Sequence, residues 1–131
     1  CTVTPTKRHL TTPVFGLNNK TSLCTDTGLL VDSDVLMIRR ASTAVAPSLV
    51  AAQHYIQSNF DDVILAKGDL ANFTLTEMDG TTLAPIHEFY QDVYYVDSDN
   101  NFKRRRLVNG AIVDEPLIEG VDDFQLQYGI D

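Results

Sequence analysis

Short apolar runs separated by polar turn residues set the pattern of this sequence. Residues 35–38, 63–66 and 93–96 are apolar runs of four, and Asp or Ser residues precede or follow each of them. Runs of this length suit strands and are too short for a buried helix. The third run, Val-Tyr-Tyr-Val, is made of residues that favour a pleated sheet. The pattern therefore predicts a β-rich fold.

Two turns predict a pair of consecutive hairpins in the second half of the chain. Residues 97–101 form the run Asp-Ser-Asp-Asn-Asn, whose side chains bond their own backbone and tolerate left-handed geometry. The returning strand is expected over residues 102–108. Asn109 and Gly110 then form a dipeptide that favours a tight two-residue turn, followed by a strand that begins at residues 111–113.

Two segments do not fit a simple strand. Leu49, Ala52 and Ile56 recur at helical spacing after Pro47, which a helix start tolerates, and this spacing predicts a short helix. Near the C-terminus the apolar face changes sides between residues 121 and 124. A regular strand cannot do this, so we expect a β-bulge or a brief turn at Asp122 or Asp123.

Size and charge narrow the classes of protein. The chain has 131 residues, which fits a single domain over residues 1–131. Its formal net charge of −8 would repel phosphate backbones, so nucleic acid is not an expected partner. The longest nearly apolar stretch, residues 44–52, is far shorter than the roughly 20 residues that a membrane-spanning helix needs.

The two cysteines, Cys1 and Cys24, are candidates for a disulfide. A bond between them would fix the N-terminus, which is otherwise prone to fray. It would close a loop of about 24 residues, stabilise the fold by roughly 3 kcal/mol, and persist only in an oxidising compartment. Two unrelated free thiols are the alternative. A metal site is less favoured, because two thiolates without nearby His do not make a tetrahedral set.

Other chemical sites have little support in the sequence. His9, His54 and His87 lie in three separate segments without metal-ligand spacing, which favours surface or loop histidines. The run at Asp97 and Asp99 begins like a calcium loop, but Phe and Val occupy the positions that need Gly and Glu. We therefore interpret it as a hairpin turn. Sequence motifs of hydrolases, nucleotide-binding proteins and zincins are absent, so we predict no catalytic residue, metal or cofactor.

One basic cluster stands out in this acidic chain: Lys103, Arg104, Arg105 and Arg106. In an extended strand Lys103 and Arg105 would face one way, and Arg104 and Arg106 the other. One interpretation is a solvated edge strand that its charge protects from aggregation. The other is a docking site for an acidic patch on a partner subunit, in which charge sets partner choice and association rate.

The C-terminal run over residues 117–131 carries the most specific pattern. It resembles the "LxEGVxxxQxxYGxD" signature of PilW-type minor pilins of the type IV pilus. Two further pieces agree in order: Ser-Asp-Val-Leu-Met-Ile-Arg at residues 33–39 resembles the "SDVLxIR" strand of that family. Val-Tyr-Tyr-Val at residues 93–96, followed by Arg-Arg-Leu at residues 105–107, resembles its "YYI…LxRRxL" hairpin. The resemblance covers approximately residues 32–131.

This resemblance implies an α+β, mainly β head domain of the pilin or pseudopilin type, with an antiparallel sheet. The N-terminal helix that anchors such prepilins in the inner membrane has no counterpart here, so we expect a truncated periplasmic head. The implied role is that of a structural subunit in type IV pilus assembly, in a Gram-negative bacterium, at the periplasmic face of the inner membrane or in the fibre. The implied partners are the other minor pilins and the major pilin. An adhesin-like binding module at the pilus tip and an enzyme of another class are the alternatives.

Overall fold

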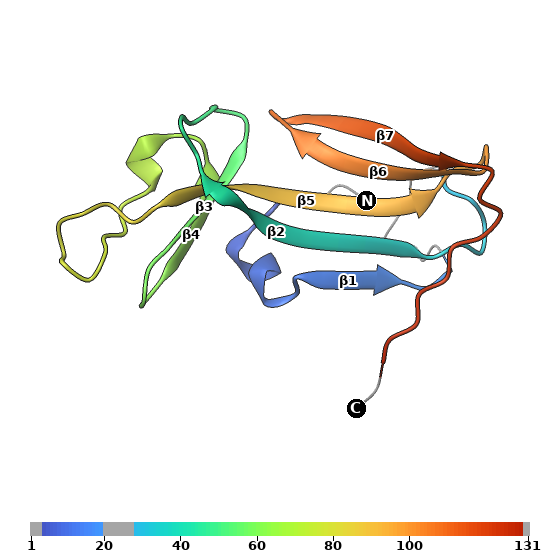
Figure 1. Cartoon of the computed structure of the whole chain (residues 1–131), viewed down its shortest axis with the longest axis horizontal. Helices are drawn as coiled ribbons and strands as arrows, with labels where there is room; N and C mark the ends of the chain where they lie inside the picture. The colour runs from blue at the N-terminus through green and yellow to red at the C-terminus, as the bar shows by residue number, and fades with distance from the viewer. Residues whose placement is uncertain (1–3, 20–27, 130–131) are drawn as a thin grey trace.

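The computed structural model describes residues 4–19 and 28–129, and these residues form one antiparallel sheet of seven strands (Figure 1). The prediction of a mainly β fold is therefore confirmed. The described residues contain two short 3-10 helices and no α-helix. In chain order the elements are η1 (Lys7–Thr11), β1 (Val14–Leu17), β2 (Val35–Val45), β3 (His54–Ser58), β4 (Val63–Lys67), η2 (Leu70–Asn72), β5 (Ile86–Val96), β6 (Asn101–Val108) and β7 (Ala111–Glu119).

Strand β5 organises the sheet, because it pairs with three other strands. Strand β2 lies along one side of it. The other side pairs with β3 over residues 86–88 and with β6 over residues 92–96. Strand β4 continues the sheet beyond β3, and β7 continues it beyond β6. The sheet is consequently long, with β3 and β4 at one end of its long axis and the C-terminal segment at the other (Figure 1).

The two predicted hairpins are confirmed. At the first turn, Asp97 accepts the backbone N–H groups of Asp99 (3.0 Å) and Asn101 (2.9 Å) through Oδ1, as turn-forming aspartates do. At the second turn, Asn109 (φ 49°) and Gly110 (φ 79°) both have the positive φ angles that a type I′ turn requires. The run that begins like a calcium loop is thus a hairpin turn.

The prediction of a short helix from Leu49, Ala52 and Ile56 is wrong. Residues 49–53 form a loop that ends in a turn over residues 50–53, and Ile56 lies in β3. The alternating residues Tyr55 and Gln57 are buried, and they hold this segment in the sheet. The backbone N–H of Val50 donates to the Tyr55 hydroxyl at 3.0 Å, which fixes the turn against the strand. The apparent helical spacing combines two residues of a loop with one residue of a strand. Tertiary packing, and not this spacing, determines the structure of the segment.

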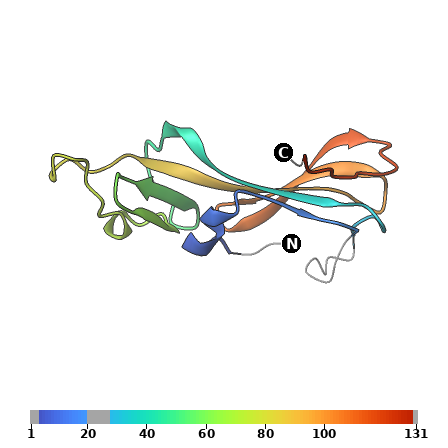
Figure 2. The same ribbon diagram turned by 90° about the horizontal axis from the view of Figure 1, so that it is seen from below.

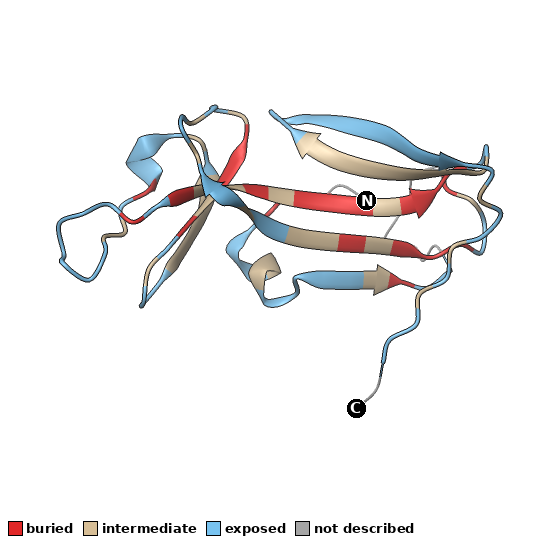
Figure 3. Ribbon diagram, in the orientation of Figure 1, coloured by how far each residue is buried: buried red, intermediate tan, exposed pale blue. Residues whose placement is uncertain are grey.

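Two small apolar clusters form the core (Figure 3). The first packs on one face of the sheet between β1, β2 and β5, which we name the core face; its residues are Leu17, Leu29, Val35, Met37, Val93 and Tyr95. The second lies at the β3 and β4 end and consists of Tyr55, Phe73 and Ile86, with Ala46, Leu49, Ile64 and Ala66 packed against it. Cross-strand partners share a face, so the register determines which side chains lie opposite the core face.

The C-terminal segment leaves the sheet earlier than the sequence predicts. Strand β7 ends at Glu119, Gly120 turns the chain with φ 73°, and residues 121–129 form no strand. The prediction of a β-bulge or a brief turn at Asp122 or Asp123 is wrong. The irregularity lies in β7 instead, where Leu117 is an extra residue between the partners of Phe102 and Lys103. The apolar face changes sides because this tail crosses back over the sheet. Asp34 binds it, accepting the N–H of Leu126 at 2.7 Å.

Candidate docking face

The basic cluster lies on β6, which is an interior strand. Strand β5 pairs with one side of it and β7 with the other, so the interpretation as an edge strand is wrong. The register confirms the predicted orientation. Lys103 and Arg105 pair with Tyr95 and Val93 and share the core face, whereas Arg104 and Arg106 project from the opposite side.

Both cations on the core face bind carboxylates of the same chain. Lys103 forms an ion pair with Asp97, which is buried in the turn. Arg105 donates to both oxygens of Asp114 through Nε (2.6 Å) and Nη2 (2.9 Å). Its guanidinium also lies over the Tyr95 ring at 5.0 Å from the ring centroid. Burial, which is the main cause, raises the pKa of Tyr95 to about 12, so the phenol stays protonated at neutral pH.

The opposite side of the sheet is named here the open face and is defined by Ile38, Arg40, Tyr90, Arg104 and Arg106. These residues share one side, because Arg40 pairs with Tyr90, and Ile38 pairs with Asp92, the partner of Arg106. Figure 2 shows η1 on the other side of the sheet and the C-terminal tail on this one. Among the described residues, no helix lies over the open face.

The centre of the open face is a stack of two guanidinium groups on one aromatic ring. Arg40 lies 4.8 Å and Arg106 lies 4.4 Å from the centroid of the Tyr90 ring. Arg106 also donates to both oxygens of Asp92, at 2.5 Å and 2.7 Å, and Asp92 is only 1% exposed. The bond to Asp92 is the main cause that raises the pKa of Arg106. This arrangement holds the Arg106 guanidinium against the Tyr90 ring at the surface of the sheet.

Arg40 and Arg104 differ from Arg106 in how far their charge is neutralised. Arg104 forms an ion pair with Glu115 of β7, and both side chains reach solvent. Arg40 is exposed, and within the described parts of the chain its guanidinium contacts the Tyr90 ring without a carboxylate in ion-pair distance. Docking through the basic cluster stays a prediction. If docking occurs on this side of the sheet, Arg40, Tyr90 and Arg106 are the residues at the centre of the surface, in place of the four residues of the basic cluster.

The ion pair of Lys103 and Asp97 makes the folded state sensitive to acid. Burial by itself would raise the pKa of Asp97, but the bonds from Lys103, Asn101 and Asp99 together outweigh burial and lower it to about 2. An aspartate in an unfolded chain has a pKa of about 3.9. The folded state therefore binds a proton less readily, and this pair stabilises the fold fully only above about pH 4.

Replacement of Asp97 by Asn is expected to remove part of the acid sensitivity. The stability difference between the wild type and Asp97→Asn should be constant near neutral pH and should shrink as the pH falls from about 4 to about 2. Urea unfolding at a series of pH values measures it. Asp61→Asn, an exposed residue outside this turn, is the control. A difference that stays constant down to pH 2 would contradict the assignment.

The other sequence candidates do not gather into one site. His54 is buried in β3, His87 lies in β5 within 3.1 Å of the carbonyl oxygen of Ala44, and His9 lies in η1. Burial, the main cause, lowers the pKa of His54 and of His9. Among the described residues, no three His, Cys, Asp or Glu side chains form a group that could hold a metal ion. Cys1 and Cys24 lie outside the described residues.

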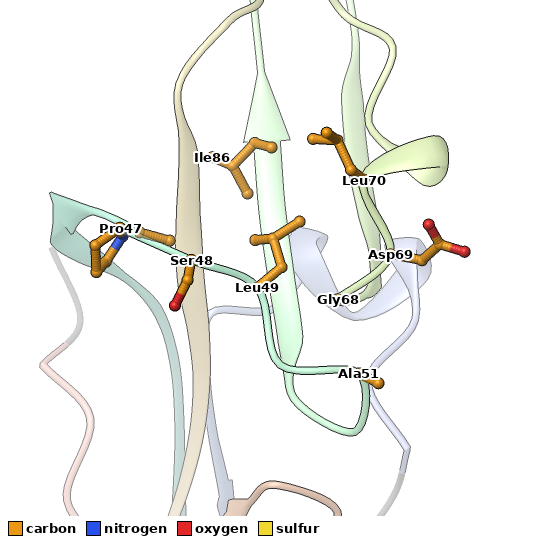
Figure 4. Close-up of a pocket in the computed structure, with 9 residues that line it drawn as sticks. Pro47, Ser48, Leu49, Ala51, Gly68, Asp69, Leu70 and Ile86 are labelled. Atoms are coloured by element: carbon orange, nitrogen blue, oxygen red, sulfur yellow. The ribbon is translucent and has the colours of Figure 1, made fainter.

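A shallow groove of about 600 Å³ lies beside the second apolar cluster (Figure 4). Pro47 and Leu49 of the loop before β3 line it, together with Leu70 of η2 and Ile86 of β5. The side chains of Leu49, Leu70 and Ile86 converge in the groove, whereas the carboxylate of Asp69 points away from them (Figure 4). That carboxylate accepts the N–H of Ala71 and caps η2. The groove is therefore apolar, without a convergent set of polar groups.

Sequence reasoning identified Arg106 but missed its partners. Tyr90 and Asp92 precede the run at residues 93–96, and Arg40 follows the run at residues 35–38. Alternation along the two strands places each of them on a face, which is a usable signal. The pairing of β2 with β5 cannot be read from either segment alone. Only the register brings Arg40 opposite Tyr90.

Within the described residues, no helix has the length and apolar character needed to span a membrane. Comparison with protein-family models, with curated proteins and with solved structures found no match. A function for this chain is therefore inferred from its own residues and from the geometry of the open face.

Proposed function

We propose that this chain is a structural subunit of a type IV pilus, of the minor pilin type, and that it contacts neighbouring pilins through the open face. The observation that carries the proposal is the open face itself. It presents an Arg40–Tyr90–Arg106 stack without a covering helix among the described residues. Tyr and Arg are, together with Trp, the residues enriched at the energetic centres of protein interfaces.

The C-terminal run that resembles the minor pilin signature supports this proposal through its position. Two residues that match the signature act on the backbone: Gly120 turns the chain, and Gln125 donates to the carbonyl of Asp32 at 3.0 Å. Between them Phe124, which the signature does not specify, packs on Phe102 with ring centroids 5.1 Å apart. Gly16 provides the space in which the tail crosses β1, since a Cβ there would lie 1.9 Å from the Tyr128 hydroxyl oxygen. The C-terminal run thus lies across one end of the open face, held by contacts with the sheet, as expected of a structural segment.

Charge supports a protein partner for this face. The chain carries a net charge of −8, but on the open face Arg106 is balanced by Asp92 and Arg104 by Glu115. Another acidic subunit can therefore approach here with less repulsion than elsewhere on the surface. Glu88, which accepts the Tyr90 hydroxyl, adds a further carboxylate on this face, and Arg40 adds a cation without an ion pair among the described residues, which favours a carboxylate on the partner. In a pilus the other minor pilins and the major pilin would supply that partner, on the periplasmic side of the inner membrane.

Substitution of Arg40 by Glu tests the proposal. In the bacterium that encodes this chain, Arg40→Glu should lower the recovery of other minor pilins in a pull-down and should reduce surface piliation. Because Arg40 is exposed, its loss should change the free energy of unfolding by less than about 1 kcal/mol. A thermal melt of each protein separates docking from folding.

Arg8→Glu is the matched control, because it makes the same charge change on η1, outside the open face. It should leave recovery and piliation at the wild-type level. Equal recovery of partners by wild type and Arg40→Glu would remove the open face from the interface. Normal piliation after deletion of the gene would contradict the pilus assignment as a whole.

A further inference from the structure

The end of the molecule opposite the C-terminal tail carries a second groove. It lies between the β3–β4 turn, residues 58–62, and the loop before β5, residues 76–85, which projects from the end of the sheet (Figure 1). We name it the tip groove. Its volume is about 380 Å³, and Asn59, Phe60, Glu77, Met78 and Pro85 are among the residues that line it. It is separate from the open face and from the groove beside Pro47.

The tip groove presents two large apolar side chains to solvent. Met78 is 87% exposed and Phe60 is 75% exposed, and no other large apolar residue of the described chain exceeds these values. Exposed apolar side chains that gather at one place mark interaction sites, whereas scattered ones need no explanation. Met adapts to varied partners because its side chain is unbranched and polarisable. The pair thus forms an apolar contact surface.

The loop that presents Met78 is held in one conformation. Asp79 accepts the N–H groups of Thr81 (2.9 Å) and Thr82 (2.8 Å), and the N–H of Glu77 donates to the carbonyl of Thr82 at 2.8 Å. The Asn59 amide donates to the carbonyl of Thr76 at 2.9 Å and ties this loop to the β3–β4 turn. A site held in place in this way loses little conformational entropy when a partner binds.

The acidic residues around the groove favour a positively charged partner. Residues 58–62 and 76–85 contain four acidic residues and no Lys, Arg or His. Lys7 neutralises Asp62 at 2.5 Å, which leaves Asp61, Glu77 and Asp79. The bond from Thr82 is the main cause that lowers the pKa of Asp79 to about 2, so this group stays ionised. The groove is an apolar surface inside a negative field.

We propose that the tip groove binds an extended peptide segment of a partner protein, which places an apolar side chain against Phe60 and Met78 and a Lys or Arg beside Glu77. A second copy of this chain would bring two acidic rims together, and an anionic lipid surface would meet the same repulsion. A basic, apolar peptide has the complementary charge. This inference is independent of the pilus assignment and of the open face.

The two methionines of the chain make a direct test possible. Met78 lines the groove, whereas Met37 is buried in the first apolar cluster and reports on the fold. The protein is labelled with ¹³C in its methionine methyl groups and titrated with the peptide acetyl-Lys-Lys-Phe-Leu-Lys-amide, up to about 1 mM. We expect the Met78 methyl signal to shift and saturate while the Met37 signal stays in place. The counterpart with Glu in place of each Lys should produce no shift.

Two variants of the groove and one control variant outside it test the position of the site. Phe60→Ser should weaken binding of the basic peptide about tenfold, the loss expected for one aromatic contact. Glu77→Gln should weaken it about two- to fivefold, and added salt should reduce that difference. Val31→Ser, which truncates an exposed apolar residue away from the groove, is the control and should bind like the wild type.

Four results would overturn the proposal. They are an unmoved Met78 signal, equal shifts of Met78 and Met37, equal binding of the acidic peptide, and a Met78 shift that depends on protein concentration alone. The last result would indicate a second copy as the occupant. None of these outcomes depends on pilus assembly, so failure here and failure of the proposed function are distinguishable.

Discussion

Replacement of Arg106 by Met is expected to lower the free energy of unfolding by about 3 kcal/mol, or roughly 10 °C in Tm. The reason is the buried carboxylate of Asp92, which is 1% exposed and receives two hydrogen bonds from Arg106. Without the guanidinium, Asp92 remains as a buried charge without its partner, and Tyr90 loses the cation above its ring. Urea unfolding followed by circular dichroism measures the loss.

Arg104→Met is the matched control, because it removes the same group from the same face of the same strand. Its partner Glu115 is exposed, so the loss should stay below about 1 kcal/mol. The double variant Arg106→Met with Asp92→Val should recover part of the stability, since it removes both charges together. If Arg104→Met and Arg106→Met destabilise equally, burial of Asp92 is not the determining feature.

Replacement of Gln57 by Leu is expected to cost about 3 kcal/mol. Gln57 is 0% exposed, and its amide nitrogen donates to the carbonyls of Leu75 (3.1 Å) and Ala84 (2.9 Å). Its amide oxygen accepts the N–H of Leu75 at 3.0 Å. The side chain thus hydrogen-bonds two stretches of loop backbone, of which Ala84 is buried and Leu75 is partly buried. Leu fills the space but leaves the N–H of Leu75 and the carbonyl of Ala84 without this partner, whereas the Leu75 carbonyl keeps its bond from the N–H of Ala84.

Gln125→Leu provides the comparison, because its exposed amide also donates to a backbone carbonyl, that of Asp32 at 3.0 Å. Water can replace that bond, so the change should stay within about 0.5 kcal/mol. Hydrogen exchange gives a second measurement. In Gln57→Leu the amide of Leu75 should exchange faster, with little change at β2. Unchanged protection at Leu75 would show that Gln57 does not hold this loop.

The local features of the fold were predictable from sequence where a short segment decides its own structure. The turn at Asp97 needs only its own carboxylate and the next few N–H groups. Asn109 and Gly110 accept positive φ at little cost, so the hairpin between β6 and β7 follows from two residues. The faces of Lys103 and Arg106 follow from alternation along an extended strand.

The incorrect predictions have two different causes. The helix expected near Leu49 fails because of contacts that are distant in sequence, whereas the edge position expected for β6 overlooks the following strand of its own hairpin. Leu49 packs against Tyr55, Phe73 and Ile86, which holds it in a loop over the strand. Strand β6 lies inside the sheet only because β7 folds back along it for its whole length. Local propensity is weak beside such packing.

The sequence by itself determined the antiparallel strands, the two hairpin turns and the alternation that divides the basic cluster between two faces, because these depend on neighbours within a few residues. Tertiary structure alone decided that Arg106 binds a buried Asp92, that Arg40 lies over Tyr90, and that Phe60 and Met78 share one groove. Phe60 and Met78 lie in two loops that are joined by the hydrogen bond from Asn59 to Thr76, whereas the other two contacts join different strands and depend on the register of the sheet. That register is fixed by burial of the core face as a whole, a property that no single segment carries.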